Sequence, residues 1–435
     1  MSDPQRSLSI IFSLLLMFGA VVPAAVGATP SSIAPEEPLP SPPGNAGTHA
    51  ETGREATPEI GAVQRVSFHL MPNTAGSIRV EVTYELTADV SSLFASIPRD
   101  ATLRSKTGFS YRGEEVYELK WDETTSSPSF TIVVGNESGT YGLNYVDTGS
   151  WAFTGTRVYS AYYSTSADAY QYTWQAGDKM VAKAKIGSGL TGYAGTKLAY
   201  IGDHDRISVS GREQQFRVVV PRVASPDQLN EGLSALARSS RMLRVGNRDP
   251  IVNVFLAPKP VREGGVTLGE SGDQQDYWVG PDSTSPYSLE NVLVHEYVHT
   301  RQSLSLGDRM AWFTEASAEY YAALFSYQQG YSGFSAFHSD VMGVENLDAV
   351  LSRPSSWSTT LVPYSKGYRV LAALDARIRQ ASGGDRSLQY VFRQMNAHEG
   401  EISLADFKRI VEDVAGKSLD SWIERYVTTS SVPEV

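Results

Sequence analysis

The chain has 435 residues, 41% of them hydrophobic, which is enough for two or three domains with their own cores. Its net charge of −11 argues against nucleic acid as a partner, because binding nucleic acid calls for a basic surface. The chain contains no cysteine, which excludes disulfides and leaves His and carboxylate side chains as the plausible protein ligands for a metal.

Residues 1–28 have the pattern of a secretory signal peptide. Arg6 supplies a positive charge, Leu8 to Val22 form an apolar core, and a small-residue cleavage site ends at Ala28. The apolar run is also long enough to remain uncleaved, in which case residues 8–28 would anchor the protein in a membrane. Either way, we expect a secreted or extracytoplasmic protein.

Residues 29–60 are rich in Pro, Ser, Gly, Glu and Thr and hold few large apolar side chains, so we expect a disordered linker. Residues 61–220 are rich in strand patterns bounded by Gly, Asp, Asn and Ser, which predicts an N-terminal antiparallel β-sandwich. The clearest strand patterns are Arg79 to Leu86, Phe130 to Val134, Arg157 to Tyr163 and Gln215 to Val220.

Many Tyr and Trp residues lie between residues 141 and 174. They are expected to pack the strands, and the alternative is that they line a face that binds a ligand. Asn136 begins an Asn-Glu-Ser glycosylation sequon, whose use depends on the organism.

Residues 221–380 mix helix and strand patterns. Ser225 opens a helix that runs to about Leu243, with Leu residues at helical spacing. Ile251 to Leu256 is typical of a buried strand, and Asp276 to Val279 of a short one. An α+β lobe therefore precedes the segment that carries the candidate chemistry.

That segment is a His-Glu-x-x-His pattern, with His295, Glu296 and His299 in an apolar run from 288 to 306 that no Pro or Gly interrupts. We expect a helix over this run, with Ser288 as its N-cap. Two His residues four apart lie about 40° apart around a helix, so both imidazoles can reach one metal ion. Glu296 lies beside them and can hold a water on that metal.

A catalytic zinc usually has three protein ligands, so a third must be found. Gly307 and Asp308 are the natural break between two helices, as C′ residue and next N-cap. His299 lies eight residues before Gly307 and Glu315 eight after it, so an antiparallel helical hairpin returns Glu315 to the level of His299. Glu319, one turn further, can accept a hydrogen bond from a ligand histidine. The alternative is an amphipathic helix pair with solvated Glu side chains.

These residues resemble the gluzincin metallopeptidases, in particular the aminopeptidase-N-like and glycyl-aminopeptidase-like families. The resemblance rests on residues 295–299, on the Trp-Phe-Thr-Glu-Ala-Ser-Ala-Glu-Tyr-Tyr run 312–321, and on Tyr364-Ser365-Lys366-Gly367, which is similar to the families' Tyr-x-Lys-Gly segment. It covers about residues 260–430. It implies that His295, His299 and Glu315 bind one zinc ion, that Glu296 is the general base, and that Tyr364 stabilises the oxyanion.

The resemblance also implies a zincin-like (thermolysin-like) α+β catalytic domain, here residues 221–380, followed by a helical C-terminal part over 381–435. In such folds an edge strand pairs with the extended substrate, and we expect this strand at Tyr277 to Gly280. The aminopeptidases' Gly-x-Met-Glu-Asn segment, whose Glu holds the free amino group, has no clear counterpart. Glu270, in the Gly-rich run 264–270, is the candidate for that role.

The remaining elements follow from spacing. Residues 330–357 are loop-like and would form a wall of the cleft, and a helix over 365–380 follows Tyr364. Lys366 is expected to be structural. We expect helices over 403–414 and 418–427, and fraying of residues 428–435.

The sequence therefore predicts a secreted zinc metallopeptidase that hydrolyses peptide or protein substrates with a zinc-bound water activated by Glu296. Whether it is an aminopeptidase or an endopeptidase stays open. The competing class is a cell-surface binding module with a structural zinc, which would need a fourth protein ligand.

Overall fold

The computed structural model describes residues 61–435 apart from 72–76, 98–100, 113–114, 136–144, 157, 173–179, 247, 260, 262–263, 269–274 and 344. The predicted signal or anchor over 1–28, the linker 29–60, Asn136 and Glu270 lie outside the described residues. No helix of the described ranges is long and apolar enough to cross a membrane.

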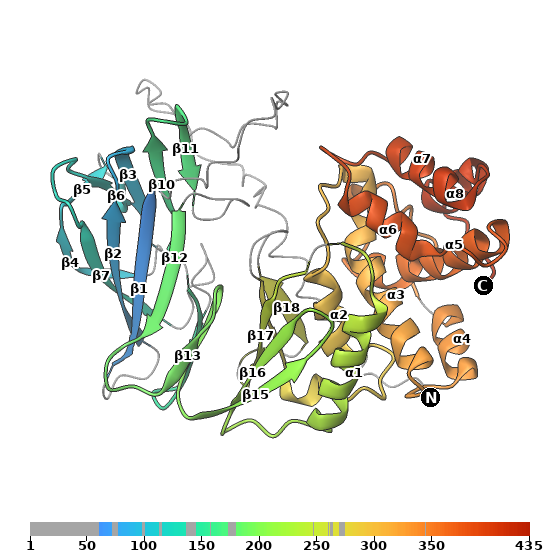
Figure 1. Ribbon diagram of the computed structural model, residues 1–435, viewed down its shortest axis with the longest axis horizontal. Coiled ribbons are helices and arrows are strands. Elements are labelled where there is room, and N and C mark those ends of the chain that lie inside the picture. Colours follow the sequence, from blue (N-terminus) through green and yellow to red (C-terminus); the bar gives the residue numbers. More distant parts are fainter. Residues whose placement is uncertain are drawn as a thin grey trace.

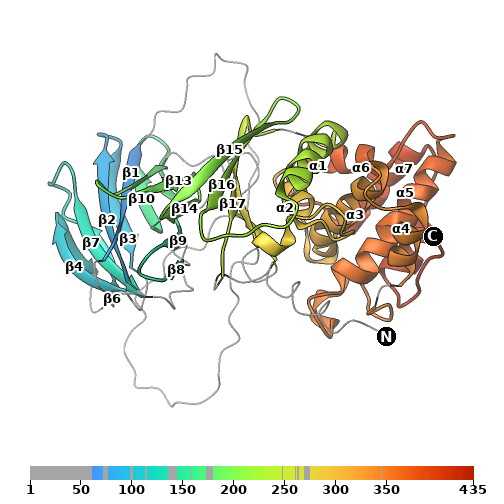
Figure 2. The same cartoon turned by 90° about the horizontal axis from the view of Figure 1, so that it is seen from below.

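The described chain is a multi-sheet α+β fold with a helical C-terminal part. Figures 1 and 2 show strands β1 to β7 and β10 to β12 at one end of the long axis, β15 to β17 in the middle and helices α4 to α8 at the other end. The candidate chemistry lies where the middle sheet meets the helices.

Two five-stranded sheets make up most of the β-rich end, in the orders β12-β1-β2-β7-β4 and β11-β10-β3-β6-β5. Alternate residues of β2 and β7 are buried because successive side chains of a strand point to opposite faces. Residues of both sheets share one hydrophobic core that includes Phe68, Leu93 and Phe130. The strands are β1 (Ala62–Leu70), β2 (Ser77–Leu86), β3 (Val90–Ser96), β4 (Thr102–Thr107), β5 (Phe109–Arg112), β6 (Glu115–Trp121), β7 (Ser129–Gly135), β10 (Ser160–Ser164), β11 (Ala169–Tyr172) and β12 (Met180–Ile186).

The prediction of purely antiparallel strands was wrong at one pair. Strands β1 and β12 run parallel, with Ala62 opposite Met180. A long connection through the other strands separates β1 from β12, and such a connection allows parallel pairing where a tight hairpin does not.

A third sheet, in the order β13-β14-β9-β8, joins the β-rich end to the middle sheet. Its Trp151, Phe153 and Tyr200 pack with Phe255 of the middle sheet in one apolar cluster. Trp151 and Tyr162 are both buried in apolar clusters, so these two aromatic residues pack the strands, as expected. The strands of this sheet are β8 (Tyr145–Asp147), β9 (Ala152–Gly155), β13 (Gly192–Ala194) and β14 (Leu198–Ile201).

A buried carboxylate ties the third sheet to the middle one. Asp276 accepts hydrogen bonds from the main-chain nitrogens of Lys197 (2.6 Å) and Leu198 (3.0 Å) and from Asn253 Nδ2 (2.8 Å). Gly195 is required beside it, because an added Cβ would lie 2.3 Å from Asp276 Oδ2. The β-rich end is therefore anchored on the sheet that supports the candidate site.

The middle sheet has the order β15-β16-β17-β19-β18. Strands β16, β17 and β19 run parallel, whereas β15 and β18 pair antiparallel at the two edges. The bounds are β15 (His204–Ser210), β16 (Gln215–Pro221), β17 (Ile251–Leu256), β18 (Gly265–Leu268) and β19 (Asp276–Val279). The predicted boundary at residue 220 lies within β16, and β15 and β16 belong to the same sheet as β17.

The predicted edge strand was also wrong. Tyr277 to Val279 belong to β19, which has β17 on one side and β18 on the other, so its main-chain groups are already paired. The edge strand on this side is β18. A strand of only four residues that begins with Gly carries too little apolar pattern to stand out in the sequence.

Helices cover the middle sheet and form the far end of the molecule. They are α1 (Leu229–Met242), α2 (Val292–His299), α3 (Trp312–Gln328), α4 (Phe334–Met342), α5 (Tyr368–Ala381), α6 (Leu388–Asn396), α7 (Leu404–Ala415) and α8 (Asp420–Val427). A capping box at Ser403 and Asp406 begins α7. The segment 330–357 was predicted as loop, but it contains α4, whose Phe337 and Val341 are buried in the core.

Candidate metal centre

Helix α2 carries the two histidines and is shorter than the predicted run from 288 to 306. It begins after Asn291, not after Ser288, whose hydroxyl instead accepts from Glu290 N at 3.3 Å in a local turn. It ends at His299, after which Arg301 N and Gln302 N bond back to Val298 O and His299 O in tighter turns. Leu304, expected on the same helix, lies beyond it.

The connection to α3 also differs from the expected hairpin turn. Gly307 has a φ of −67°, so it is not a left-handed C′ residue, and Asp308 begins a 3-10 turn over Asp308–Met310. Leu306 forms a bridge with Ile402, and Gly307 N donates to Ile402 O. A distant segment therefore holds this connection, yet α3 still returns Glu315 to the level of His299.

The two imidazoles and Glu315 converge on one point. His295 Nε2 and His299 Nε2 are 3.1 Å apart, and Glu315 Oε2 lies 3.3 Å and 3.1 Å from them. All three residues are buried, and among the described residues they are the group that can hold a metal ion. In a tetrahedral zinc site, ligand atoms about 2.0–2.1 Å from the ion lie about 3.3 Å from one another.

The other ring nitrogens have acceptors of their own. His295 Nδ1 lies 3.1 Å from Glu319 Oε2, as predicted for Glu319, and His299 Nδ1 lies 2.9 Å from Gln302 Oε1. When each Nδ1 donates its proton to these acceptors, each Nε2 presents a lone pair. Three lone-pair atoms within about 3.3 Å repel one another unless a cation lies between them, so the donor set fits a metal ion such as zinc.

Gln302 was not predicted as part of the site. Its Nε2 donates to Thr314 O (2.7 Å) and to Ser317 Oγ (3.0 Å), and both of these residues lie on α3. These bonds fix the amide so that its oxygen faces His299. The signal was its position three residues after His299, which is within reach even though the helix ends between them.

The electrostatics of the site also favour a cation. Burial lowers the pKa of His295, but hydrogen bonds with Glu315 and Glu319 outweigh it and raise that pKa to about 10. For Glu315, burial raises the pKa, but the neighbouring His299 and His295 bring it well below its ordinary value. The buried carboxylates therefore stabilise positive charge at the point where the three donors meet.

Glu296 faces the edge strand and lies outside the triad of donors. Its Oε2 accepts from Thr267 Oγ1 of β18 at 2.8 Å, and its main-chain oxygen lies 2.8 Å from the same hydroxyl. An added Cβ at Gly265 would lie 2.6 Å from Glu296 Cγ, so this position of β18 has no room for a side chain. Burial raises the pKa of Glu296, although His299 and His295 oppose the shift. A raised pKa suits a carboxylate that must take up and release a proton.

Tyr364 lies in a π-helical turn, Pro363–Gly367, that leads into α5. Its ring is buried and stacks on the His295 ring, with centroids 5.7 Å apart and planes 5° apart. Such turns are frequent at functional sites. The structure thus brings His295, Glu296, His299, Glu315, Glu319 and Tyr364 into one neighbourhood.

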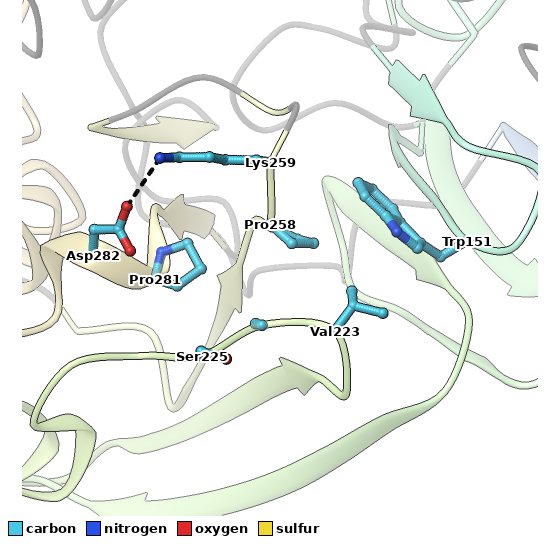
Figure 3. A pocket seen from close by; sticks show the side chains of 8 residues that line it. Trp151, Val223, Ser225, Pro258, Lys259, Pro281 and Asp282 are labelled. Atoms are coloured by element: carbon cyan, nitrogen blue, oxygen red, sulfur yellow. Dashed lines mark ion pairs between the residues drawn. The ribbon is translucent and has the colours of Figure 1, made fainter.

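A separate cavity of about 240 Å³ lies where β16, β17 and β19 end, between the third sheet and the middle sheet (Figure 3). Trp151, Val223 and Pro281 line it, and Lys259 forms an ion pair of 3.3 Å with Asp282 at its side. None of the residues that line it belongs to the group of metal-ligand candidates.

No protein-family model matches the chain, and no curated protein matches its sequence. Solved structures do match the fold. An aminopeptidase N family protein from Idiomarina loihiensis is 11% identical, with a TM-score of 0.64 over 86% of this chain and 77% of that chain. An M1 zinc metallopeptidase from Deinococcus radiodurans is 13% identical, with a TM-score of 0.52 over 86% and 94%.

A variant of the Deinococcus radiodurans enzyme, bound to a Tyr-Ser-Ala substrate, is 12% identical, with a TM-score of 0.52 over 86% of this chain and 95% of that chain. These structural similarities agree with the resemblance of residues 295–299, 312–321 and 364–367 to the gluzincins. At such low sequence identity they show a shared fold. The chain therefore has the fold shared by these M1 zinc metallopeptidase and aminopeptidase N family structures.

Proposed function

We propose that this protein is a zinc-dependent metallopeptidase that acts on peptide or protein substrates outside the cytoplasm. The observation that carries the proposal is the convergence of His295 Nε2, His299 Nε2 and Glu315 Oε2 within 3.3 Å, with Glu296 beside them. The shared fold supports it, because the solved structures of that fold are named as zinc metallopeptidases. The signal pattern of residues 1–28 supports export.

Within this proposal the donors hold one zinc ion, and Glu319 and Gln302 fix the orientation of the two imidazoles. Zinc, when bound there, would polarise the scissile carbonyl and make water more acidic. Glu296 accepts the proton of the attacking water and passes it to the leaving amine. The Tyr364 hydroxyl donates a hydrogen bond to the oxyanion that forms on the carbonyl.

The finer fold assignment belongs to the same proposal. The sheet β15 to β19 with α2 and α3 would be a thermolysin-like catalytic domain. Its edge strand β18 borders Glu296, and the helices α2 and α3 carry the three metal-ligand candidates. The first two sheets, which share a core, would form the sandwich. An extended peptide would pair with the outer edge of β18 and not with β19.

The residues leave two candidates for bond preference. The fold neighbours favour an aminopeptidase, since one is named as an aminopeptidase N family protein. The described part of β18 favours an endopeptidase, because the side chain that it turns to Glu296 is Thr267, which carries no charge to hold a free amino group. Glu270, the candidate for that role, lies outside the described residues.

The first experiment is to measure the zinc content of the purified protein and its cleavage of a mixed peptide library, with each peptide both free and N-acetylated. One zinc per chain with cleavage of free peptides alone would establish an aminopeptidase. Cleavage of both forms at internal bonds would establish an endopeptidase. One zinc without any cleavage would favour a binding protein with a structural metal, and no zinc would defeat the proposal.

Replacing Glu319 by Gln is expected to weaken zinc binding by about 10- to 100-fold, because outer partners orient the ligand histidines. The Gln amide can donate its NH₂ to His295 Nδ1. The proton of the neutral imidazole then lies on Nε2, where it blocks the lone pair that would bind zinc. The measurement is zinc affinity by competition with a chelator. An equal affinity in Glu319→Gln and in the wild type would show that Glu319 does not orient His295.

Replacing Tyr364 by Phe is expected to lower kcat by about 10²- to 10³-fold with little change in KM, which is the cost of losing one oxyanion donor. The Phe ring keeps the stacking on His295, so zinc content should stay at one per chain. The measurement is steady-state cleavage of the best library peptide. A fall in zinc content instead of kcat would contradict the assigned role.

A further inference from the structure

Two buried cationic side chains follow Tyr364 and reach a distant part of the chain. Lys366 is 0% exposed, and its Nζ donates to Ala349 O at 2.6 Å and to Thr429 O at 2.7 Å. Arg369 is 5% exposed, and its Nε donates to Pro433 O at 2.9 Å. Both cations therefore depend on main-chain carbonyls of residues 429–433.

Residues 428–435 were predicted to fray, and the structure corrects this. Pro433 is buried, and Arg369 also donates to Met342 O at 3.3 Å, which links the segment to the end of α4. Both views place the end of the chain beside α4 and α5 (Figures 1 and 2). Residues 428–435 include few large apolar residues, and the segment is held through the main-chain oxygens of Thr429 and Pro433. Main-chain contacts do not depend on residue type, so they leave no sign in the sequence.

The turn that carries Tyr364 is held from its other side by α3. An added Cβ at Gly367 would lie 2.8 Å from Ala316 Cβ, so the turn packs closely against the residue next to Glu315. The Tyr364 ring meanwhile stacks on His295. The π-helical turn thus lies between the donor helices on one side and the carbonyls of Ala349 and Thr429 on the other.

We propose that residues 429–435 and Lys366 form a clasp that positions Tyr364, so that Lys366 is a positioning residue for the reaction and the segment is part of the active centre. The inference rests on the proposed function. Lys366 sits two residues from Tyr364 in the same turn, so release of its ammonium group from Thr429 O shifts the turn relative to His295. A shift of about 1 Å at a reacting group can cost about 10²-fold in rate.

A purely stabilising role predicts a different result. Burying an ammonium group is costly unless its hydrogen bonds are made, so removal of the clasp must change stability in either case. Stability alone, however, would change the fraction of folded enzyme and would act equally whether or not Tyr364 has a hydroxyl. The measurement must therefore be whether the effect of replacing Lys366 on kcat depends on the Tyr364 hydroxyl.

The test is a double-mutant cycle in the full chain with Lys366→Met and Tyr364→Phe, measured well below the unfolding temperature of every variant. Lys366→Met is expected to lower kcat by about 10-fold or more, with KM and zinc content unchanged. In the Tyr364→Phe background the same substitution should have little further effect on kcat. Lys120→Met is the matched control, because Lys120 lies on β6 in the β-rich end, where it pairs with Glu123.

An unchanged kcat in Lys366→Met, or an equal loss in both backgrounds, would overturn the clasp. If Lys366→Met does not fold, Arg369→Met gives the same cycle, because it releases the segment at Pro433 and leaves Lys366 in place. A wild-type protein that cleaves no peptide defeats the proposed function itself. A wild type that cleaves while Lys366→Met keeps its full kcat defeats the clasp alone.

Discussion

Replacing Glu296 by Gln is expected to lower kcat for peptide hydrolysis by about 10²- to 10⁴-fold, the range that a general base contributes. The amide cannot accept the proton of the attacking water. Its oxygen can still accept from Thr267 Oγ1, which lies 2.8 Å from Glu296 Oε2, so the side chain should keep its place. Because Glu296 is outside the group of three donors, zinc content should stay at one per chain.

The measurement combines steady-state cleavage with the zinc content of the same sample. Glu399→Gln is a matched control, since Glu399 is exposed and lies in the turn after α6. Undiminished hydrolysis in Glu296→Gln would remove Glu296 from the mechanism. Loss of zinc along with hydrolysis would show that Glu296 holds the metal and is not a separate base.

The donor set could be predicted from sequence because it depends on helical spacing. His295 and His299 are one turn apart, and the eight-residue distances to Gly307 correctly placed Glu315 beside them. The supporting argument was nevertheless wrong in detail. Helix α2 stops at His299, and the link to α3 is pinned by Ile402, about a hundred residues away, which no local pattern can reveal.

The surroundings of Glu296 could not be predicted in the same way. Its partner Thr267 lies on β18, and the position of a strand in a sheet depends on pairing with distant segments. The edge strand was predicted at Tyr277 to Gly280, whose Tyr-Trp-Val run has strong β propensity. A strand with apolar residues on both faces is better placed inside a sheet, which is where β19 lies.

The motif around Tyr364 led to a residue that lies beside the candidate site, whereas the contacts that support its turn were not predicted. The Tyr-x-Lys-Gly resemblance singled out Tyr364, and the structure stacks it on His295. Lys366 was expected to be structural, and its contacts with two carbonyls agree with that expectation. Its acceptor at Thr429 could not be foreseen, because a main-chain carbonyl leaves no trace in the residue type.

Replacing His295 by Ala is expected to abolish both stoichiometric zinc binding and hydrolysis. The imidazole supplies one donor of three, and its Nδ1 also pairs with Glu319, 3.1 Å away. Its removal leaves Glu315 and Glu319 buried with one fewer partner each, so the remaining donors also lose their orientation. We expect activity at the level of the metal-free enzyme, measured with the same peptide and with zinc content determined in parallel.

His398→Ala is the control, since His398 lies in the turn after α6, outside the group of donors. Added zinc should restore the metal-free wild type but not His295→Ala, which separates loss of the site from loss of the ion. Retention of one tightly bound zinc by His295→Ala would place the metal elsewhere. Together with Glu296→Gln, this variant distinguishes the residue that moves the proton from the residues that hold the metal, because only the first should keep zinc and lose turnover.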